Sequence, residues 1–405
     1  MPVFRPFPAL RYSSDLDLNL VLAPPYDVLS EDDVHELHES HPHNITHVDV
    51  PENQDYSYAA TKLWDWIEEG ILTADKDYTF SIYRMAFTDP TGTPREIVGV
   101  LGGLEVVDDP LAPTDESTED RGTTVLPHER TTPKASTDRL ELMHATATNS
   151  SPVWGLSLAT GLTAELHEPG EVLGSVVVDG ATHTVERISD PDRIARIREI
   201  IESDDVLIAD GHHRYGVSRI YRDEVRNKTG RHNTRAERTL TFINELIEDQ
   251  LSIQAIHRLY SGASPEALRS GLETCFDLSP VTVTTTILAE MVDLGRLVLL
   301  WPDGSAEWLT PKPGAFDHVR SLDGLWLETA LEGVQVDVTY QHGLDEMRDC
   351  VATGTFTAGV LIRPTSIEEI RRTAREGLLM PPKSTFFTPK LLTGWVLRAT
   401  EPLKD

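Results

Sequence analysis

The sequence predicts an α+β protein with a mixed β-sheet. Three kinds of pattern support this prediction: short apolar stretches typical of strands, amphipathic stretches with helical spacing, and turn residues between them. The chain has 405 residues, of which 25% are charged and 39% hydrophobic, as in an ordinary globular protein. This length is enough for two or three domains with sizeable hydrophobic cores.

Residues 1–107 are predicted to form an N-terminal α+β section that is rich in strands. Ser30 can cap a short helix at 31–40, and Gly70 should end a second helix at 55–70. The second helix should place four apolar residues near one face: Tyr58, Leu63, Trp66 and Ile67. Two paired strands are expected next, at 78–87 and 95–107, across a turn rich in Pro and Gly.

An acidic, Pro-containing loop at 108–122 leads to a central section at 123–260. Within it, Asp179-Gly180 should join two strands of a hairpin at 175–188, because this dipeptide favours tight hairpin turns. The other predicted elements of this section are strands at 153–159, 204–211 and 239–246 and helices at 134–147, 191–203 and 212–230.

The last section, at 261–405, is predicted to be a C-terminal α/β section. Its expected elements are helices at 265–276, 343–354 and 366–377, a hairpin at 296–310 and a strand at 357–363. Residues 380–398 contain too much Pro for an interior helix.

The charge balance argues against a nucleic-acid partner. With 66 acidic and 36 basic residues, the net charge is -30, whereas DNA-binding proteins neutralise phosphates with Lys and Arg. We find neither a bilayer-spanning apolar stretch nor a signal-peptide pattern, so we expect no membrane association and a cytoplasmic location. Cys275 and Cys350 are too few for a disulfide framework or a thiolate metal site, and both should be buried as apolar residues.

The most informative stretch is DVLIADGHHRY at 205–215. An apolar strand should deliver Asp210 and Gly211 into a tight turn, and a helix should begin at the histidines. The helix N-terminus, His212, His213 and Arg214 would then converge on one point, which suits a phosphate. Asp210 could hold Mg²⁺. The alternative is a capped turn whose histidines make only structural hydrogen bonds.

A second stretch, VLPHERTTPKASTDR at 125–139, places His128, Glu129 and Arg130 just after a predicted strand. A glutamate beside cations can stay ionised and accept a proton from a hydroxyl group. Solvent-exposed surface charges are the alternative interpretation.

Two further stretches are rigid because they contain consecutive prolines. In MPPKSTFFTPK at 380–390, Lys383, Ser384 and Thr385 lie on an extended arm that could clamp a small polar ligand or serve as a structural strap. In APPYDV at 23–28, the prolines present Tyr26 and Asp27, either to a site or in a plain turn.

Several common motifs are absent from the sequence. We find no P-loop, no protein-kinase motif set, and no C-x-x-C or H-E-x-x-H pattern. A P-loop NTPase, a protein kinase and the common zinc sites are therefore not expected.

Together, these stretches resemble a widespread bacterial and archaeal family that is labelled a domain of unknown function and whose members are described as relatives of the chromosome-partitioning protein ParB. The resemblance spans nearly the full chain and is carried by APPYDV, LPHERTTPKASTDRLELMHAT, IADGHHRY, AIHRLY and MPPKSTFFTPKLLTGWV. A Pro-His-Glu followed by Asp-Gly-His-His-Arg is also similar to the free serine kinases of the ParB/sulfiredoxin superfamily. This similarity implies a mixed-sheet ParB/sulfiredoxin-like catalytic core at 123–260, with an inserted hairpin and an added N-terminal section.

The second resemblance implies Mg²⁺-dependent phosphoryl transfer from ATP or ADP to the hydroxyl of free L-serine. Glu129 would be the base that deprotonates the hydroxyl, with His128 and Asp210 as further catalytic residues and Asp210 as the Mg²⁺ ligand. The residues implied to bind the nucleotide phosphates are Gly211, His212, His213, Arg214 and Arg130. The residues implied to contact serine are Lys383, Ser384, Thr385, Tyr26 and Asp27.

Two other functions stay open. One is a ParB-like regulatory module that binds or hydrolyses a nucleotide, and the other is a metal-dependent hydrolase built on His128, His212, His213 and Asp210. The sequence also leaves open the choice between ATP and ADP, the selectivity for small hydroxy amino acids, and the oligomeric state, a homodimer included.

Overall fold

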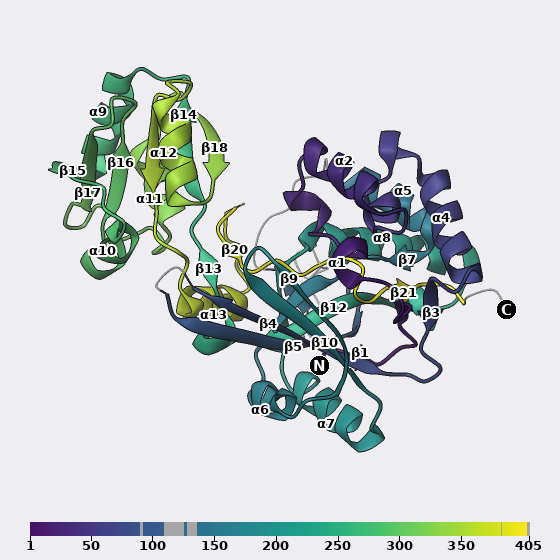
Figure 1. Ribbon diagram of the computed structural model, residues 1–405. Coiled ribbons are helices and arrows are strands. Elements are labelled where there is room, and N and C mark those ends of the chain that lie inside the picture. Colours follow the sequence, from purple (N-terminus) through teal and green to yellow (C-terminus); the bar gives the residue numbers. More distant parts are fainter. Residues whose placement is uncertain (90–91, 109–124, 128–135, 382, 403–405) are drawn as a thin grey trace. The chain divides into compact units, whose positions relative to one another are not determined.

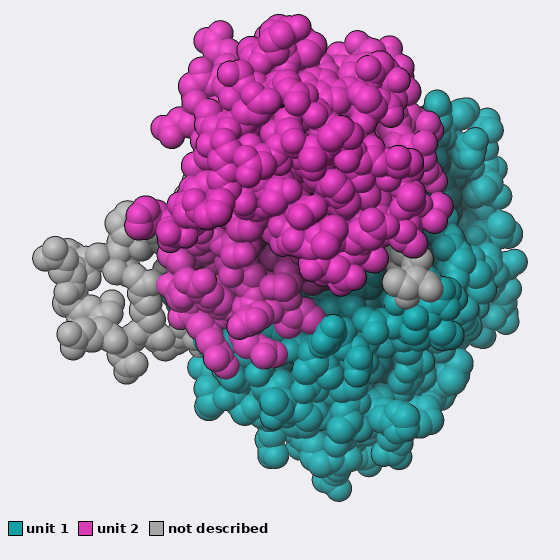
Figure 2. Space-filling view, turned by 90° about the vertical axis from the view of Figure 1, so that its left-hand side faces the viewer, with its two compact units in different colours: residues 1–252, 389–405 teal, residues 253–388 magenta. Residues whose placement is uncertain are grey.

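A computed structural model describes the chain except for residues 90–91, 109–124, 128–135, 382 and 403–405. The chain forms two compact units: unit 1 comprises residues 1–252 and 389–405, and unit 2 comprises residues 253–388 (Figures 1 and 2). The predicted α+β class with a mixed sheet is confirmed, whereas the ParB/sulfiredoxin-like type of core stays a prediction. Residues 109–122 of the predicted acidic loop lie outside the described part.

Unit 1 is organised by a nine-stranded mixed sheet. Its strands run in the order β6 (Val125–Pro127), β11 (Val206–Asp210), β8 (Val153–Ser157), β12 (Arg238–Glu245), β5 (Pro94–Glu105), β4 (Phe80–Thr88), β10 (Ala181–Ile188) and β9 (Glu171–Val178), and β1 (Phe4–Arg5) also pairs with β5. The pairs β6–β11 and β8–β12 are parallel, and the other pairs are antiparallel. The sections at 1–107 and 123–260 therefore contribute strands to one sheet.

The hairpin between β9 and β10 is confirmed. Asp179 and Gly180 both have positive φ, +50° and +76°, which is the geometry of the tight turn that Asp-Gly favours. The sheet extends further than the sequence indicated, because β9 begins at Glu171 rather than at Ser175.

Helices cover both faces of this sheet, with α6 (Leu162–His167) and α7 (Pro191–Ile201) on one face (Figure 1). The helices on the other face include α4 (Tyr56–Glu68), α5 (Ser136–Thr146) and α8 (His212–Thr229). Apolar side chains from strands and from α7 form a shared core, among them Phe4, Phe80, Val100, Ile197 and Val206.

The two predicted N-terminal helices are present, with one correction to a buried face. Ser30 and Asp33 form a capping box at the start of α2 (Glu31–Ser40), as the sequence suggested. In α4, however, Tyr58 is 42% exposed, and Ala59 is buried with Leu63 and Trp66 instead. Positions 59, 63 and 66 are spaced by four and three residues, so they share a helix face that Tyr58 misses.

Unit 2 contains a six-stranded antiparallel sheet. Its strands run in the order β15 (Phe276–Val281), β17 (Ala306–Pro311), β16 (Leu297–Leu300), β19 (Ala358–Leu361), β14 (His257–Ser261) and β18 (Asp337–Gln341). Its helices are α9 (Pro265–Cys275), α10 (Ile287–Leu294), α11 (Asp323–Ala330), α12 (Leu344–Ala352) and α13 (Ile367–Glu376). A separate short pair joins β13 (Ile253–Gln254) to β20 (Phe386–Phe387).

Each face of the unit 2 sheet packs against its own core. Leu297 and Leu299 of β16 belong to one core and Val298 and Leu300 to the other, because successive strand residues point to opposite faces. Cys275 and Cys350 are free and only half-buried, each beside one of these cores, which corrects the expectation that both are buried. Among the described helices of the whole chain, none combines the length and the apolar character needed to cross a membrane.

Candidate functional site

The turn at 210–214, which the sequence predicts to bind phosphate and which is called the phosphate turn here, joins β11 to α8. Asp210 is the last residue of β11, Gly211 follows it, and α8 begins at His212 as expected. Gly211 has a φ of +81°, a left-handed conformation that glycine adopts without steric cost. Glycine supplies no side chain to cap the helix, so an anion can take the place of a cap at the positive end of the helix dipole. His212 and His213 are half-buried in the first turn of α8.

Neighbouring groups hold Asp210 in its ionised form. Its Oδ1 accepts a hydrogen bond from the Gly211 N–H at 2.8 Å, and its Oδ2 accepts one from Lys390 Nζ, also at 2.8 Å. Arg214 Nη2 lies 3.9 Å from Oδ1. Burial by itself would raise the pKa of Asp210, but Lys390, Arg214 and the two hydrogen bonds outweigh it and hold this pKa well below its ordinary value. The carboxylate is therefore charged at neutral pH.

Arg214 places a fixed positive charge beside this carboxylate. Its Nη1 donates to the carbonyl oxygen of Pro152 and lies 3.5 Å from Ser151 Oγ. Its Nη2 lies 3.9 Å from Asp27 Oδ2, the same distance as from Asp210. Burial opposes the charge on Arg214, but Asp27 and Asp210 more than compensate, so the pKa of this guanidinium is raised.

Two segments from opposite ends of the chain meet at the phosphate turn. The first is the APPYDV stretch, in which η1 (Tyr26–Val28) presents Asp27 to Arg214. The second is the C-terminal segment that carries Lys390. Ala23 and Thr393 exchange two backbone hydrogen bonds, of 3.3 and 2.8 Å, and thereby fix the two segments side by side.

Lys390 was not expected from the sequence. Its signal was its position in the PKLLTGW part of a family signature, directly after Pro389. That signal does not identify its partner, because Asp210 lies 180 positions away in the chain.

Two further residues, Arg139 and Asp49, lie in this region. The sequence indicated Arg139 only as a cation near Glu129 and did not indicate Asp49. Arg139 Nη1 lies 3.5 Å from Asp49 Oδ1, and Arg139 Nε donates to Asp138 at 2.9 Å. The Arg139 guanidinium lies over the ring of Tyr26, 4.2 Å from its centroid, a favourable cation–π contact. Tyr26 thus lies beside a residue of this region, and its contact with a substrate stays a prediction.

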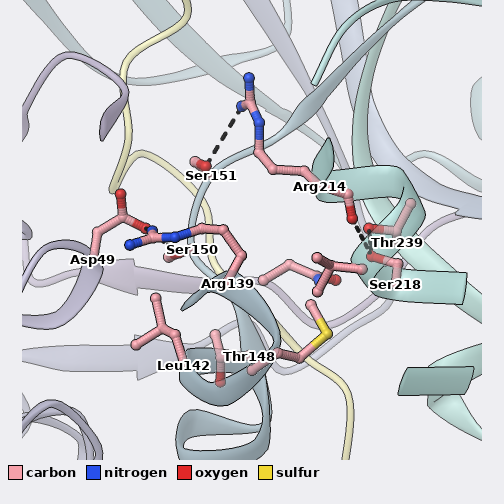
Figure 3. A pocket seen from close by; sticks show the side chains of 12 residues that line it. Asp49, Arg139, Leu142, Thr148, Ser150, Ser151, Arg214, Ser218 and Thr239 are labelled. Carbon is pink, nitrogen blue, oxygen red and sulfur yellow. Dashed lines mark hydrogen bonds and ion pairs between the residues drawn. The ribbon is translucent and has the colours of Figure 1, made fainter. Parts of the chain in front are cut away.

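Asp49, Arg139 and Arg214 border a small cavity in unit 1 (Figure 3). The cavity has a volume of about 40 Å³. Its polar lining includes Asp49, Arg139, Ser150, Ser151 and Arg214.

The remaining predicted site residues lie outside the described part of unit 1. His128, Glu129 and Arg130 lie outside the described residues. The strand before them, β6, ends at Pro127, which is paired in parallel register with Ile208 of β11. Parallel strands end at the same edge of a sheet, so β6 and β11 lead to one edge.

Lys383, Ser384 and Thr385 belong to unit 2. The carbonyl oxygen of Lys383 accepts a hydrogen bond from Arg258 at 3.4 Å, and the Ser384 hydroxyl donates to the Pro381 carbonyl at 2.7 Å. These bonds fix the segment within unit 2. Its contribution to a site with the phosphate turn stays a prediction.

A metal ion would have one carboxylate ligand at the described part of the turn. Across the described residues, we find no group of three or more His, Cys, Asp or Glu side chains placed to hold a metal ion. Asp210 can nevertheless offer a carboxylate oxygen to Mg²⁺, because proteins commonly bind this ion through one or two carboxylates together with substrate phosphates.

Comparisons with known proteins identify the family. The chain resembles a free serine kinase variant in complex with AMP, with 12% identity and a TM-score of 0.39 over 69% of this chain and 89% of that one. It also resembles a conserved hypothetical protein from Pyrococcus furiosus, with 11% identity and a TM-score of 0.36 over 65% of this chain and 87% of that one. A third similar structure is a C-terminally truncated SbnI from Staphylococcus aureus, with 13% identity and a TM-score of 0.36 over 67% of this chain and 83% of that one. These likenesses are too distant to assign a function. A comparison with curated proteins finds no match. The family described as "Protein of unknown function (DUF1015)" matches residues 4–325, and the chain belongs to that family.

Proposed function

We propose that this protein transfers a phosphoryl group from a nucleotide, ATP or ADP, to the hydroxyl of free L-serine. The observation that carries the proposal is the meeting of Lys390, Arg214 and an ionised Asp210 at the start of α8. Enzymes that transfer phosphoryl groups supply mainly positioning and charge neutralisation. Two cations and the N–H groups of a helix N-terminus offer both at one place.

In this proposal the turn binds the phosphates of the donor nucleotide. Arg214 neutralises charge on the phosphoryl oxygens, and the backbone of His212 and His213 supplies N–H donors. The N–H of Gly211 is bonded to Asp210, and this glycine instead lets the backbone approach the phosphates closely. Lys390 is the second cation and supports Asp210 when no nucleotide is present. Mg²⁺ held by Asp210 would add charge neutralisation between the phosphates when bound.

Glu129 is the proposed general base. It would take the proton from the serine hydroxyl while the serine Oγ forms a bond to the terminal phosphorus of the nucleotide. The bond between this phosphorus and the bridging oxygen breaks, and the shortened nucleotide leaves with the electron pair. Glu129 is not among the described residues, so its role is supported by the motif resemblance and by its place two residues after Pro127, where β6 ends beside β11. His128 and Arg130 keep their proposed roles beside the base and at the phosphates on the same grounds.

The arm of Lys383, Ser384 and Thr385 is proposed to contact the acceptor serine. A lysine and two hydroxyl side chains can donate hydrogen bonds to, and in the case of the hydroxyls also accept them from, a small polar ligand. Tyr26 and Asp27 are proposed to complete the acceptor side. Asp27 lies beside Arg214 of the turn, and Tyr26 lies beside Arg139, which lines the same cavity as Arg214.

Nucleotide hydrolysis without an amino-acid acceptor is the second candidate function. The same observation favours it, because the charges at the phosphate turn would support phosphoryl transfer to water as well as to serine.

The two functions are separated by a product assay. Purified protein is incubated with Mg²⁺, free L-serine and either ATP or ADP, and O-phosphoserine is measured by mass spectrometry. We expect O-phosphoserine from the wild-type protein and a rate about a hundredfold to ten-thousandfold lower from Glu129→Gln, with little change in nucleotide affinity. Nucleotide loss without phosphoserine would refute the kinase proposal, and near-normal turnover by Glu129→Gln would refute the role of Glu129.

A further inference from the structure

The cavity beside the phosphate turn brings buried charges of both signs into a small volume (Figure 3). Asp49 is 2% exposed and Arg139 is 9% exposed. Removing an unpaired charge from water is costly, so buried ion pairs usually make close and well-aligned hydrogen bonds. The contacts in this cavity depart from that pattern.

Asp49 and Arg139 face each other across a long contact. Their closest atoms, Oδ1 and Nη1, are 3.5 Å apart, beyond the usual distance of about 2.7–2.9 Å for a charge-assisted hydrogen bond. The short bonds of both residues go elsewhere: Asp49 accepts from the Ser150 hydroxyl at 2.5 Å, and Arg139 donates to Asp138 at 2.9 Å. The two charges therefore do not form a close, hydrogen-bonded ion pair with each other.

Arg214 lines the same cavity. Its Nε has no acceptor among the described residues, although it is buried. Its Nη2 is 3.9 Å from both Asp27 and Asp210, too far for a hydrogen bond to either. Buried donors in native proteins are nearly always bonded, so a donor of this kind marks a place where a ligand can bind.

We infer that this cavity receives the charged head of a small α-amino acid, with its carboxylate between Arg139 and Arg214 and its ammonium group against Asp49 and Ser150. An α-amino acid carries one positive and one negative group on adjacent atoms, which matches the mixed charges of the lining. The small size of the cavity, about 40 Å³, suits the charged head of such a ligand better than a large side chain.

The site is placed suitably for the transfer reaction. Arg214 is shared between the cavity and the phosphate turn, so an amino acid held there would lie next to the terminal phosphate of a nucleotide bound at Asp210. Asp49 comes from α3 (Thr46–Asp49) in the N-terminal section, which gives this section a role in acceptor recognition. The identity of the ligand as an acceptor rests on the proposed function, whereas the existence of the binding site does not.

The inference is tested by calorimetric titration of the full-length protein with L-serine, N-acetylserine and serine amide. Wild-type protein should bind L-serine and bind each analogue at least tenfold more weakly, because each analogue lacks one charged group. Asp49→Asn keeps the shape of the side chain but removes its charge, and Arg139→Met removes the guanidinium. Each should weaken serine binding by about tenfold to a hundredfold while nucleotide affinity changes less than about threefold.

Two further variants keep the test informative. Ser150→Ala is a mild change that should weaken serine binding a few-fold even if the charge variants fold poorly. Glu186→Gln is the matched control, since Glu186 is a buried carboxylate that pairs with Arg84 in the same unit, and it should leave serine binding unchanged.

The outcomes separate this inference from the proposed function. Suppose that the wild type binds serine but forms no phosphoserine, and that Asp49→Asn loses serine binding. This result would support the cavity site and refute the kinase proposal. Phosphoserine formation with an unchanged serine KM in Asp49→Asn, Arg139→Met and Ser150→Ala would support the kinase and overturn the cavity site. A parallel loss of nucleotide affinity in these variants would also overturn it, because the cavity would then bind phosphate.

Discussion

Replacing Lys390 with methionine tests whether the C-terminal segment completes the phosphate turn. The change keeps most of the apolar stem but removes the ammonium group that lies 2.8 Å from Asp210. The two side chains are 17% and 23% exposed, so the pair is neither fully buried nor a surface pair. Breaking a buried pair costs about 3–5 kcal/mol, and surface pairs contribute about 0–1 kcal/mol. Arg214 and the Gly211 N–H still stabilise the carboxylate in this variant. We therefore expect the free energy of opening of unit 1 to fall by about 2 kcal/mol.

Hydrogen exchange of the β11 amides measures this loss within unit 1 alone. A change of about 2 kcal/mol in the free energy of opening corresponds to exchange about thirtyfold faster, if the protein recloses faster than it exchanges. Asp210→Asn supplies the control: in the double variant, the effect of Lys390→Met should shrink by about 1–2 kcal/mol, because its partner is already neutral. Additive effects of the two changes, within about 0.3 kcal/mol, would refute the coupling that we derive from the structure.

Three further predictions concern phosphate binding, the acceptor and acid stability. Arg214→Ala should weaken Mg²⁺–nucleotide binding about tenfold to a hundredfold, more at low salt than at high salt; unchanged affinity in calorimetry would place the phosphates elsewhere. Thr385→Ala should raise the serine KM and leave nucleotide affinity near that of the wild type, so an unaltered serine KM would remove Thr385 from the acceptor site. Burial lowers the pKa of His183 to about 4, and because the unfolded chain protonates it below about pH 6.5, this residue should cost the protein about 3 kcal/mol of stability as the pH falls from about 6.5 to 4. His183→Gln should remove this part of the acid sensitivity of unit 1 in hydrogen exchange between pH 4.5 and 7, and an unchanged pH dependence would contradict the assignment.

Local patterns predicted the elements whose signals lie within a few residues of one another. The capping box at Ser30, the Asp179-Gly180 hairpin and the start of α8 at His212 are each specified by neighbouring residues. Tyr58 shows the limit of this reasoning, because the choice between adjacent positions on α4 depends on the partners of the helix and on where it begins.

Long-range pairings were not accessible from local patterns. β14 and β18 went unrecognised as strands, although they pair with each other, for example Leu259 with Thr339. The same reason explains the site residues that were missed: Lys390 contacts Asp210 across 180 positions, and Asp49 and Arg139 meet only once α3 and α5 are packed. The strand-to-helix turn itself was predictable because Asp210, Gly211 and Arg214 are consecutive or nearly so, and one turn of chain brings them together.

The central claim is tested most directly by presenting the protein with a choice of acceptors. Wild-type protein is incubated with Mg²⁺, ATP or ADP, and an equimolar pool of free serine, threonine, homoserine and a serine-containing peptide, and every phosphorylated product is measured by mass spectrometry. We predict that O-phosphoserine is the main product and that the peptide stays unmodified, because its serine lacks the free ammonium and carboxylate groups. Preferential phosphorylation of the peptide, or consumption of the nucleotide without any phosphorylated amino acid, would contradict the account.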